Sequence, residues 1–343
     1  MINPILVEVM RGDVLESFHR GVICIVDSDN HILYQQGDVK QVCFPRSALK
    51  FFQQIPLLCS GAIEHFGFNR KEIAIMCGSH NGEPTHVETV RSILNKIGLK
   101  EDDLQCGPQM PTLREDQYLL IKNDIKPQKI HNNCSGKHAG FLAYCVYNNL
   151  DIATYIQPTH ALHQTILTVI SDFHEYPVSL IKQGVDGCSA PIFSFPVYNQ
   201  AIAYRQLVAP NKFDQSVQNA CKLMVDSIVE FPEMIAGKQR YCTDLMRLSK
   251  GELIGKTGAD GVYSLGIVKQ QLGVCIKIDD GKMGPQYNVA QAIVEKMQLL
   301  SEADNATLHH YIATENKNFG GMVTGETKTV DLQLPQFNSI KMH

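Results

Sequence analysis

The sequence lacks long apolar runs and has no large excess of charge of either sign. No stretch approaches the roughly 20 apolar residues that a transmembrane helix needs, so we expect no membrane partner. The net charge of −4 gives no electrostatic reason to expect nucleic acid or an anionic membrane surface as a partner. The first residues include acids where a signal peptide has its apolar core, which indicates that the chain is not exported.

The cysteines lack the spacing of a disulfide framework. Their number, eleven, is odd, no paired C-x-x-C motif occurs, and Cys24, Cys77 and Cys275 lie in apolar runs typical of strands. Cysteine is among the most buried residue types, and disulfides are rare in the cytoplasm. We therefore expect reduced thiols and a cytoplasmic protein.

Disorder-promoting composition and internal boundaries are also lacking. Hydrophobic residues make up 44% of the chain and charged residues 19%, a globular composition. No repeat, low-complexity tract or clean linker of proline, glycine and serine divides the sequence. The 343 residues suit one large or two ordinary domains, and we expect one catalytic unit that spans residues 1–343.

The hydrophobic pattern predicts strands near both ends of the chain and helices between them. Residues 20–39 form a predicted hairpin around the turn sequence D-S-D-N, and the apolar run 72–77 is interpreted as a buried strand. Helices are predicted at residues 86–97, 137–147, 158–173, 212–229 and 287–300. Further strands, separated by glycine turns, are predicted at residues 253–258, 261–269 and 272–279.

This order of elements favours an α/β fold of the α+β type. Two segments, roughly residues 1–45 and 250–343, can pair into one antiparallel sheet with flanking helices. The residues between them, roughly 46–249, then form a mainly helical lobe. The layout resembles the architecture of serine β-lactamases.

A serine and a lysine lie one turn apart in the sequence C-F-P-R-S-A-L-K. Pro45 suits the first position of a helix, and residues three apart share a helix face, so Lys50 is expected beside the Ser47 hydroxyl. A partly buried lysine can lose its proton and then accept the serine proton. The same S-x-x-K pattern recurs at Ser179 and Lys182, so the motif alone is weakly specific.

Two further motifs make the serine hypothesis stronger. Ser79-His80-Asn81 follows the first motif, and Lys256-Thr257-Gly258 comes late in the chain. S-x-x-K, S-x-N and K-T-G in this order are the motifs of the penicillin-recognising serine acyltransferases. The sequence therefore predicts acyl transfer through a serine.

The densest cluster of reactive side chains is H-N-N-C-S-G-K-H at residues 131–138. Cys134 and His138 are four residues apart, Lys137 lies between them, and Cys188 offers a second thiol in a glycine-containing loop. Two sulfurs with one or two nitrogens suit zinc. A capped helix with a buried cysteine is the alternative, because the spacing is far less specific than that of a zinc finger.

The sequence N-N-C-S-G-K-H-A-G at residues 132–140 resembles the signature of the Rhizobium-type L-asparaginase family. Further blocks match in the order of the family and cover nearly the whole chain. They are E-S-F-H-R-G (16–21), F-P-R-S-A-L-K (44–50), C-G-S-H-N-G-E (77–83), D-G-C-S-A-P (186–191), G-K-T-G-A-D-G-V (255–262) and K-I-D-D-G-K (277–282).

The resemblance implies hydrolysis of L-asparagine to L-aspartate and ammonia on a fold similar to serine β-lactamases and glutaminases. It implies two Ser–Lys pairs, which fall on Ser47 with Lys50 and on Ser79 with Lys256. We favour Ser47 as the nucleophile because a helix N-terminus stabilises developing negative charge, and Ser79 is the competing candidate. A homodimer is a further expectation from the family.

The resemblance also implies zinc bound through two cysteines and a lysine. Spacing alone suggests a different ligand set, one that includes histidine. The implied ligands are Cys134, Lys137 and Cys188. The positions expected near the substrate are Arg46, His138 and Asp186. The chain departs from the family pattern at Ser189, Ala190 and Asp260, which lie outside the proposed chemistry.

Other functions remain open on the sequence alone. A β-lactamase-like hydrolase, an esterase or a glutaminase could share the Ser–Lys motifs, and a zinc-dependent binding protein would have lost its nucleophile. Both serines and both lysines are present, which disfavours the binding protein. Selectivity between asparagine and glutamine is not readable, because one methylene in a pocket is worth only about 1–3 kcal/mol.

Overall fold

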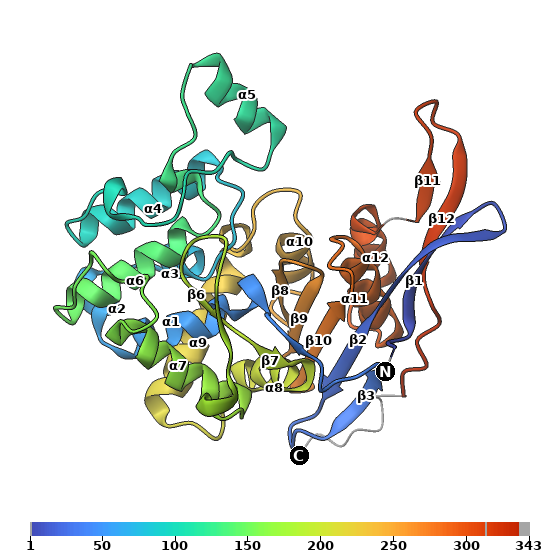
Figure 1. The fold of residues 1–343 in the computed structure, drawn as a ribbon, viewed down its shortest axis with the longest axis horizontal. Helices are drawn as coiled ribbons and strands as arrows, with labels where there is room; N and C mark the ends of the chain where they lie inside the picture. The colour runs from blue at the N-terminus through green and yellow to red at the C-terminus, as the bar shows by residue number, and fades with distance from the viewer. Residues whose placement is uncertain (1, 313, 336–343) are drawn as a thin grey trace. The chain divides into compact units, whose positions relative to one another are not determined.

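The chain forms two compact units in the computed structural model, which describes residues 2–312 and 314–335 (Figure 1). The sheet unit comprises Met1–Ala48, Phe195–Ala209 and Asp244–His343. The helical unit comprises Leu49–Ser194 and Pro210–Thr243. Each unit is therefore built from segments that are far apart in the sequence.

The sheet unit contains an eight-stranded sheet in which all neighbouring strands are antiparallel. Its order is β11-β12-β1-β2-β10-β9-β8, and β3 pairs with β2. The strands are β1 (Ile5–Arg11), β2 (Val14–Val26), β3 (Ile32–Gln36), β8 (Leu253–Gly258), β9 (Val262–Ile267), β10 (Leu272–Ile278), β11 (Glu315–Lys317) and β12 (Val323–Thr329). The predicted antiparallel sheet from the two ends of the chain, and with it the α/β class, is confirmed.

Helix α8 (Val197–Val208) packs on one face of this sheet. Cys24 and Cys275 are opposite each other in the register of β2 and β10, and both join a buried cluster with Ala201 of α8. Gly273 makes the close approach possible, since a Cβ there would lie 2.0 Å from the carbonyl oxygen of Ala201. The glycine in β10 therefore sets the distance between helix and sheet.

Helix α11 (Pro285–Lys296) covers the other face of the sheet. Ser264 of β9 accepts a hydrogen bond from Gln200 of α8. Successive side chains of a strand point to opposite faces, so the neighbouring Tyr263 points to the other face of the sheet. The ring of Tyr263 lies edge-on to Tyr287 of α11, with centroids 5.9 Å apart. Both faces of the central strands are thus covered, which explains why every residue of β8 and β9 is buried, the polar Lys256 and Thr257 included.

Shorter elements complete the sheet unit. A 3₁₀ turn, Arg46–Leu49, leads toward α1, and β4 (Val42–Cys43) pairs with β7 (Phe195–Pro196). The remaining helices near the C-terminus are α10 (Tyr241–Leu248), whose first residues belong to the helical unit, and α12 (Glu302–Leu308).

The helical unit is arranged around α6 (Ser135–Tyr147), which contacts five other helices of the unit. Those helices are α1 (Lys50–Cys59), α2 (Ala62–Phe66), α3 (Arg70–Met76), α4 (Pro84–Lys96) and α7 (Ala161–His174). The unit also contains α5 (Arg114–Lys122), α9 (Gln215–Glu230) and a hairpin of β5 (Gln183–Val185) and β6 (Pro191–Phe193).

Glycines one turn apart let α6 approach its neighbours closely. A Cβ at Gly136 would lie 2.2 Å from the carbonyl oxygen of Ile75 in α3. A Cβ at Gly140 would lie 2.4 Å from Gln54 Oε1 in α1. The two glycines of the S-G-K-H-A-G sequence are therefore packing residues that place the first turn of α6 deep in the unit.

Two local predictions were wrong. The run at 72–77 is mostly helix α3, which begins with a capping box formed by Asn69 and Glu72. The helix is buried on several sides, so its apolar residues do not show the periodicity of a surface helix. The helix expected from Pro45 begins as a 3₁₀ turn and continues as α1, which contains Pro56 in its interior. Predicted helices elsewhere differ from α4, α6, α7, α9 and α11 by a few residues at their ends.

We expect Gly136→Ala to destabilise the protein although alanine has the higher helix propensity. The new methyl group meets a backbone oxygen of α3, so we expect the free energy of unfolding to fall by about 1–3 kcal/mol in equilibrium urea unfolding. Gly107→Ala is the control, since a Cβ there meets no atom within 4 Å, and its change should stay within about 0.5 kcal/mol. A Gly136→Ala variant as stable as wild type would contradict the packing role.

Candidate active site

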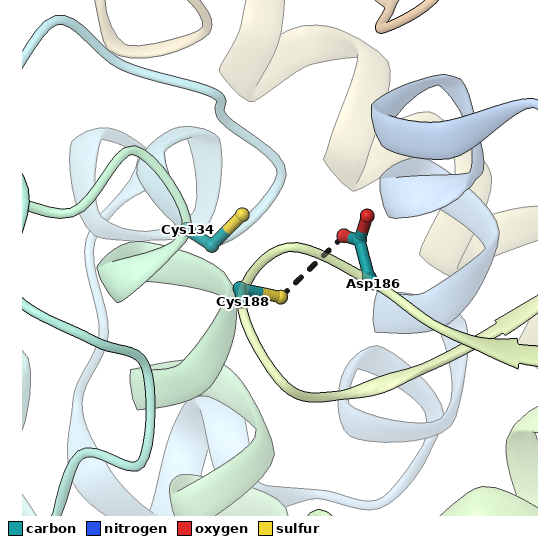
Figure 2. A group of neighbouring side chains, drawn as sticks. All are labelled: Cys134, Asp186 and Cys188. Atoms are coloured by element: carbon teal, nitrogen blue, oxygen red, sulfur yellow. Dashed lines mark hydrogen bonds between the residues drawn. The ribbon is translucent and has the colours of Figure 1, made fainter.

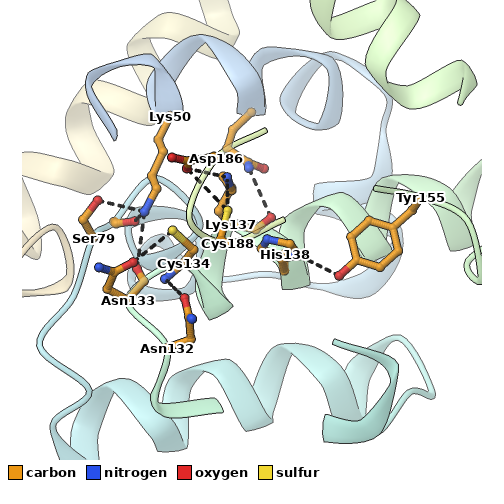
Figure 3. A network of polar contacts seen from close by, with 12 residues as sticks. Lys50, Ser79, Asn132, Asn133, Cys134, Lys137, His138, Tyr155, Asp186 and Cys188 are labelled. Carbon is orange, nitrogen blue, oxygen red and sulfur yellow. Dashed lines mark hydrogen bonds and ion pairs between the residues drawn. The ribbon is translucent and has the colours of Figure 1, made fainter. Parts of the chain in front are cut away.

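A serine and a lysine of the helical unit are in direct contact. Lys50 begins α1 and is only 1% exposed, and Ser79 lies in the loop between α3 and α4. Lys50 Nζ donates to Ser79 Oγ at 2.8 Å, to the Gly78 oxygen at 2.6 Å and to the Asn133 oxygen at 3.3 Å (Figure 3). Three acceptors match the three N–H bonds of an ammonium group. Lys50 is thus buried with its charge fully hydrogen-bonded.

Hydrogen bonds of a buried histidine fix the loop that carries Ser79. The backbone N–H of Gly82 donates to His80 Nδ1 at 3.1 Å, so the ring proton lies on Nε2. His80 Nε2 donates to the hydroxyl of Ser135, the first residue of α6, at 3.0 Å. Burial, and then the charge of His86, lower the pKa of His80 well below its ordinary value and keep it neutral. The Ser79 loop is thereby joined to the start of α6.

Two thiols, an amine and a carboxylate meet near the start of α6. Cys134 precedes the helix and Lys137 lies in its first turn, whereas Asp186 and Cys188 belong to the loop between β5 and β6. One atom from each of Cys134, Asp186 and Cys188 lies within 4.8 Å of the others (Figure 2). Lys137 Nζ is 3.0 Å from Cys188 Sγ and 3.9 Å from an oxygen of Asp186.

The charges of this cluster favour a thiolate on Cys188. Its hydrogen bond with Cys134 and the charge of Lys137 hold the pKa of Cys188 far below its ordinary value, although burial opposes the shift. The hydrogen bond with Cys188 and burial raise the pKa of Cys134 well above its ordinary value. Burial lowers the pKa of Lys137, but the charges of Cys188, Cys134 and Asp186 raise it by more. The cluster is therefore rich in negative charge.

The chemistry of the cluster fits a zinc ion. Cys188 Sγ lies 3.5 Å from an oxygen of Asp186, and a thiolate has no proton to donate across this distance. The ammonium of Lys137, 3.0 Å from Cys188 Sγ and 3.9 Å from Asp186, supplies one shared cation, and its nitrogen can bind a metal only after it loses a proton. Zinc accepts sulfur, nitrogen and carboxylate oxygen in a four-coordinate arrangement, and the residues present offer all three. Asp186 was assigned to the substrate from the sequence, and its place among potential ligands was missed although it lies two residues from Cys188.

His138 lies beside this cluster and contacts a tyrosine that sequence reasoning did not find. His138 Nδ1 is 2.6 Å from the hydroxyl of Tyr155 (Figure 3). Burial lowers the pKa of His138, and the interaction with Cys188 opposes this shift. Tyr155 follows α6 in an irregular loop and belongs to no motif, so no pattern in the sequence marked it.

The other predicted site residues belong to the sheet unit. Arg46 has a left-handed backbone with φ of 54° and forms an ion pair with Asp260. Ser47 lies in the 3₁₀ turn, and Lys256 is a buried residue of β8. The proposed pairs of Ser47 with Lys50 and of Ser79 with Lys256 each combine residues from both units, and they stay predictions.

The chain matches the model of a known protein family over most of its length. The model describes L-asparaginase II and aligns with residues 7–329. The chain belongs to the L-asparaginase II family. It is therefore an L-asparaginase enzyme, an amidohydrolase whose substrate is a small amide, and the resemblance read from the sequence is confirmed. No curated protein sequence matches this member of the family.

Solved structures with some similarity include a β-lactamase and a glutaminase. A β-lactamase of Mycobacterium bovis has 13% identity and a TM-score of 0.41, with 80% of this chain and 94% of that chain covered. A Bacillus glutaminase has 11% identity and a TM-score of 0.38, with 82% of this chain and 91% of that chain covered.

Among residues 2–312 and 314–335, no helix is both long and apolar enough to cross a membrane.

Buried histidines around the site must stay neutral for the protein to fold. Burial is the main cause that lowers the pKa of each of five histidines in the helical unit: His80, His86, His131, His138 and His163. The shift for His163 is large, to about 3, and its ring packs against Phe141 of α6. The unfolded chain takes up these protons more readily, so acid favours unfolding.

We expect His163→Leu to make the protein less sensitive to acid. The pKa of His163 is about 3 when folded and 6.5 when unfolded, so its contribution to stability is present above pH 6.5 and is lost as the pH falls toward 3. In urea unfolding, the stability lost between pH 6.5 and pH 5 should be smaller in the variant by about 1–2 kcal/mol. The exposed His310→Leu serves as control, and identical acid dependence in His163→Leu and wild type would refute this assignment.

Proposed function

We propose that this enzyme hydrolyses L-asparagine to L-aspartate and ammonia by acyl transfer through a serine that a lysine activates. The contact between Lys50 Nζ and Ser79 Oγ at 2.8 Å supports this function most directly. Both side chains are buried, at 1% and 7% exposure, so water competes little with their hydrogen bond. The family match supplies the class of substrate.

In the proposed reaction, Ser79 Oγ attacks the side-chain amide carbon of the substrate. Its proton passes to Lys50, which must be neutral at that moment, and then to the amide nitrogen, which leaves as ammonia. Water then cleaves the acyl ester, with Lys50 accepting the water proton and returning it to Ser79. The neighbouring oxygens of Gly78 and Asn133 stabilise Lys50 in its charged form during these steps.

Ser47 remains the alternative nucleophile. The sequence favours it because it lies near the N-terminal end of a helix, where free N–H groups stabilise an anion. The hydrogen bond between Ser79 and Lys50 favours Ser79 instead. Lys256, predicted to pair with Ser79, and Ser47 are then candidates for groups that relay protons or polarise the amide.

The family resemblance suggests charged side chains for the two ends of an amino acid substrate. The guanidinium of Arg46, which forms an ion pair with Asp260, can bind the α-carboxylate by paired hydrogen bonds. Asp186 can bind the α-ammonium group when its oxygens are not engaged by a metal. His138, which the family resemblance also places near the substrate, contacts Tyr155 through Nδ1 and lies beside Cys188.

We expect Ser79→Ala to lose the acyl-enzyme and Ser47→Ala to keep it. Ammonia release from L-asparagine and, in parallel, L-glutamine measures turnover, and quenched mass spectrometry with L-aspartic β-hydroxamate detects the acyl group. Ser79→Ala should lower kcat on asparagine by at least about a thousandfold because the nucleophile is gone. An adduct that maps to Ser47 in wild type, or that persists in Ser79→Ala, would reverse the assignment of nucleophile. Absence of ammonia from asparagine would refute the proposed reaction itself.

We also propose that Cys134, Lys137 and Cys188 bind zinc, with Asp186 as a further candidate ligand. The negative charge of the cluster and its mixture of sulfur, nitrogen and oxygen donors support this proposal. Bound zinc supplies a Lewis acid that can polarise or orient the substrate. The chain's own contribution is to hold the ligands on α6 and on the loop between β5 and β6.

We expect Cys188→Ala to lose zinc affinity that Cys145→Ala retains. Cys145 is a buried cysteine of α6 outside the cluster, so the control loses a comparable thiol. Competition with a chromogenic chelator should show a loss of more than about 100-fold for Cys188→Ala, beyond the 10- to 100-fold typical of outer-shell residues. Equal zinc affinity in the two variants would remove Cys188 from the ligand set.

A cytoplasmic location and a homodimeric assembly complete the proposal. No cysteine within the described residues forms a disulfide, which is consistent with a reducing compartment. The homodimer rests on the family resemblance. We propose no nucleic-acid or membrane partner, because the net charge is small and negative.

A further inference from the structure

The hydroxyl of Tyr155 links a backbone amide to the ring of His138. The N–H of Gln105 donates to the Tyr155 oxygen at 2.8 Å, and an amide N–H cannot accept in return. The other partner of the hydroxyl among the described residues is His138 Nδ1, at 2.6 Å. Since Gln105 N–H can only donate, the buried hydroxyl proton has one acceptor among these partners, the lone pair of His138 Nδ1.

This arrangement determines which ring nitrogen of His138 carries the proton. Nδ1 accepts from Tyr155, so its lone pair is used, and a neutral imidazole then bears its single proton on Nε2. A doubly protonated ring would leave the Tyr155 proton without an acceptor. Complete burial of His138 also favours the neutral ring.

The Nε2 nitrogen is placed at the cluster of thiols and lysine. It is buried and has no hydrogen bond of ordinary length and angle within the part of the chain that the structure describes, although it interacts with the Cys188 side chain. His138 follows Lys137 directly, and Figure 3 shows its ring between Tyr155 and the side of Cys188. A buried N–H without a partner calls for an acceptor, and this sulfur is the negative group that it faces.

We propose that Tyr155 is a positioning residue that holds His138 as an Nε2–H donor toward the Cys188 sulfur. This inference rests on the proposed zinc site. The proposal implies that His138, four residues after Cys134, is not a metal ligand. A ligand needs a free lone pair, and the lone pair of His138 is engaged by Tyr155. Lys137 is then the nitrogen that remains for the metal.

Histidine nitrogen NMR on the protein without added metal tests the tautomer directly. With ¹⁵N-labelled histidine, and with His138→Gln to assign the signal, we expect His138 to show an acceptor-type Nδ1 and a protonated Nε2. In Tyr155→Phe the hydroxyl that donates to Nδ1 is removed, so the His138 signal should shift toward a mixture of tautomers. Tyr204→Phe, which loses a buried hydroxyl bonded to the Ala48 oxygen in the sheet unit, should leave it unchanged. A protonated Nδ1 in wild type, or the same tautomer in Tyr155→Phe, would overturn the proposal.

Zinc affinity tests the link to the cluster and separates this inference from the proposed metal site. Chelator competition should give roughly 10- to 100-fold weaker zinc binding for Tyr155→Phe, and unchanged binding for Tyr204→Phe. Equal affinity in Tyr155→Phe and wild type would overturn the positioning role. If wild type binds no zinc, the zinc proposal fails, and the NMR result still decides the tautomer. If Tyr155→Phe does not fold, the wild-type spectrum alone confirms or refutes the Nε2–H form.

Discussion

Two almost fully buried lysines constrain the helical unit, because an ammonium group is costly to bury unless polar or negative groups surround it. Lys50 is surrounded by oxygens that carry no net charge, and one of them is the hydroxyl of Ser79. Lys137 faces the sulfur of Cys188 and the carboxylate of Asp186. The first environment brings an amine to a potential nucleophile, and the second collects anionic ligands. Both depend on the placement of α1 and α6 by close helix packing.

Much of the fold could be predicted because the strands near the two ends of the chain have strong and separate patterns. The glycine-punctuated runs of β8, β9 and β10 appear in the sequence almost with their final bounds, and the predicted hairpin at 20–39 contains β3 and the second half of β2. Helix α3 could not be predicted, since a short apolar run buried on several sides has no periodicity that distinguishes helix from strand. Helix α8 was missed because buried polar residues and alanines obscure its apolar face.

The residues of the candidate site could be predicted only where a motif carried them. Cys134, Lys137 and Cys188 come from the family signature, and the structure brings them together. The contact of Lys50 with Ser79 joins two motifs that the sequence separates by 28 residues, and helical spacing drew attention to Ser47 instead. Tyr155 acts through a hydroxyl at the end of an irregular loop, where neither periodicity nor composition marks a residue.

The ligands of the cluster come from two kinds of support. Cys134 and Lys137 are fixed to a helix whose glycines lock it against α1 and α3, whereas Asp186 and Cys188 lie on a short connection between two strands of a small hairpin. Substitutions in the helix start disturb the core as well as the site. Substitutions of Asp186 or Cys188 in the connection leave the glycine contacts of α6 in place. The hairpin loop is thus the part where the candidate ligands can change with the least disturbance to helix packing.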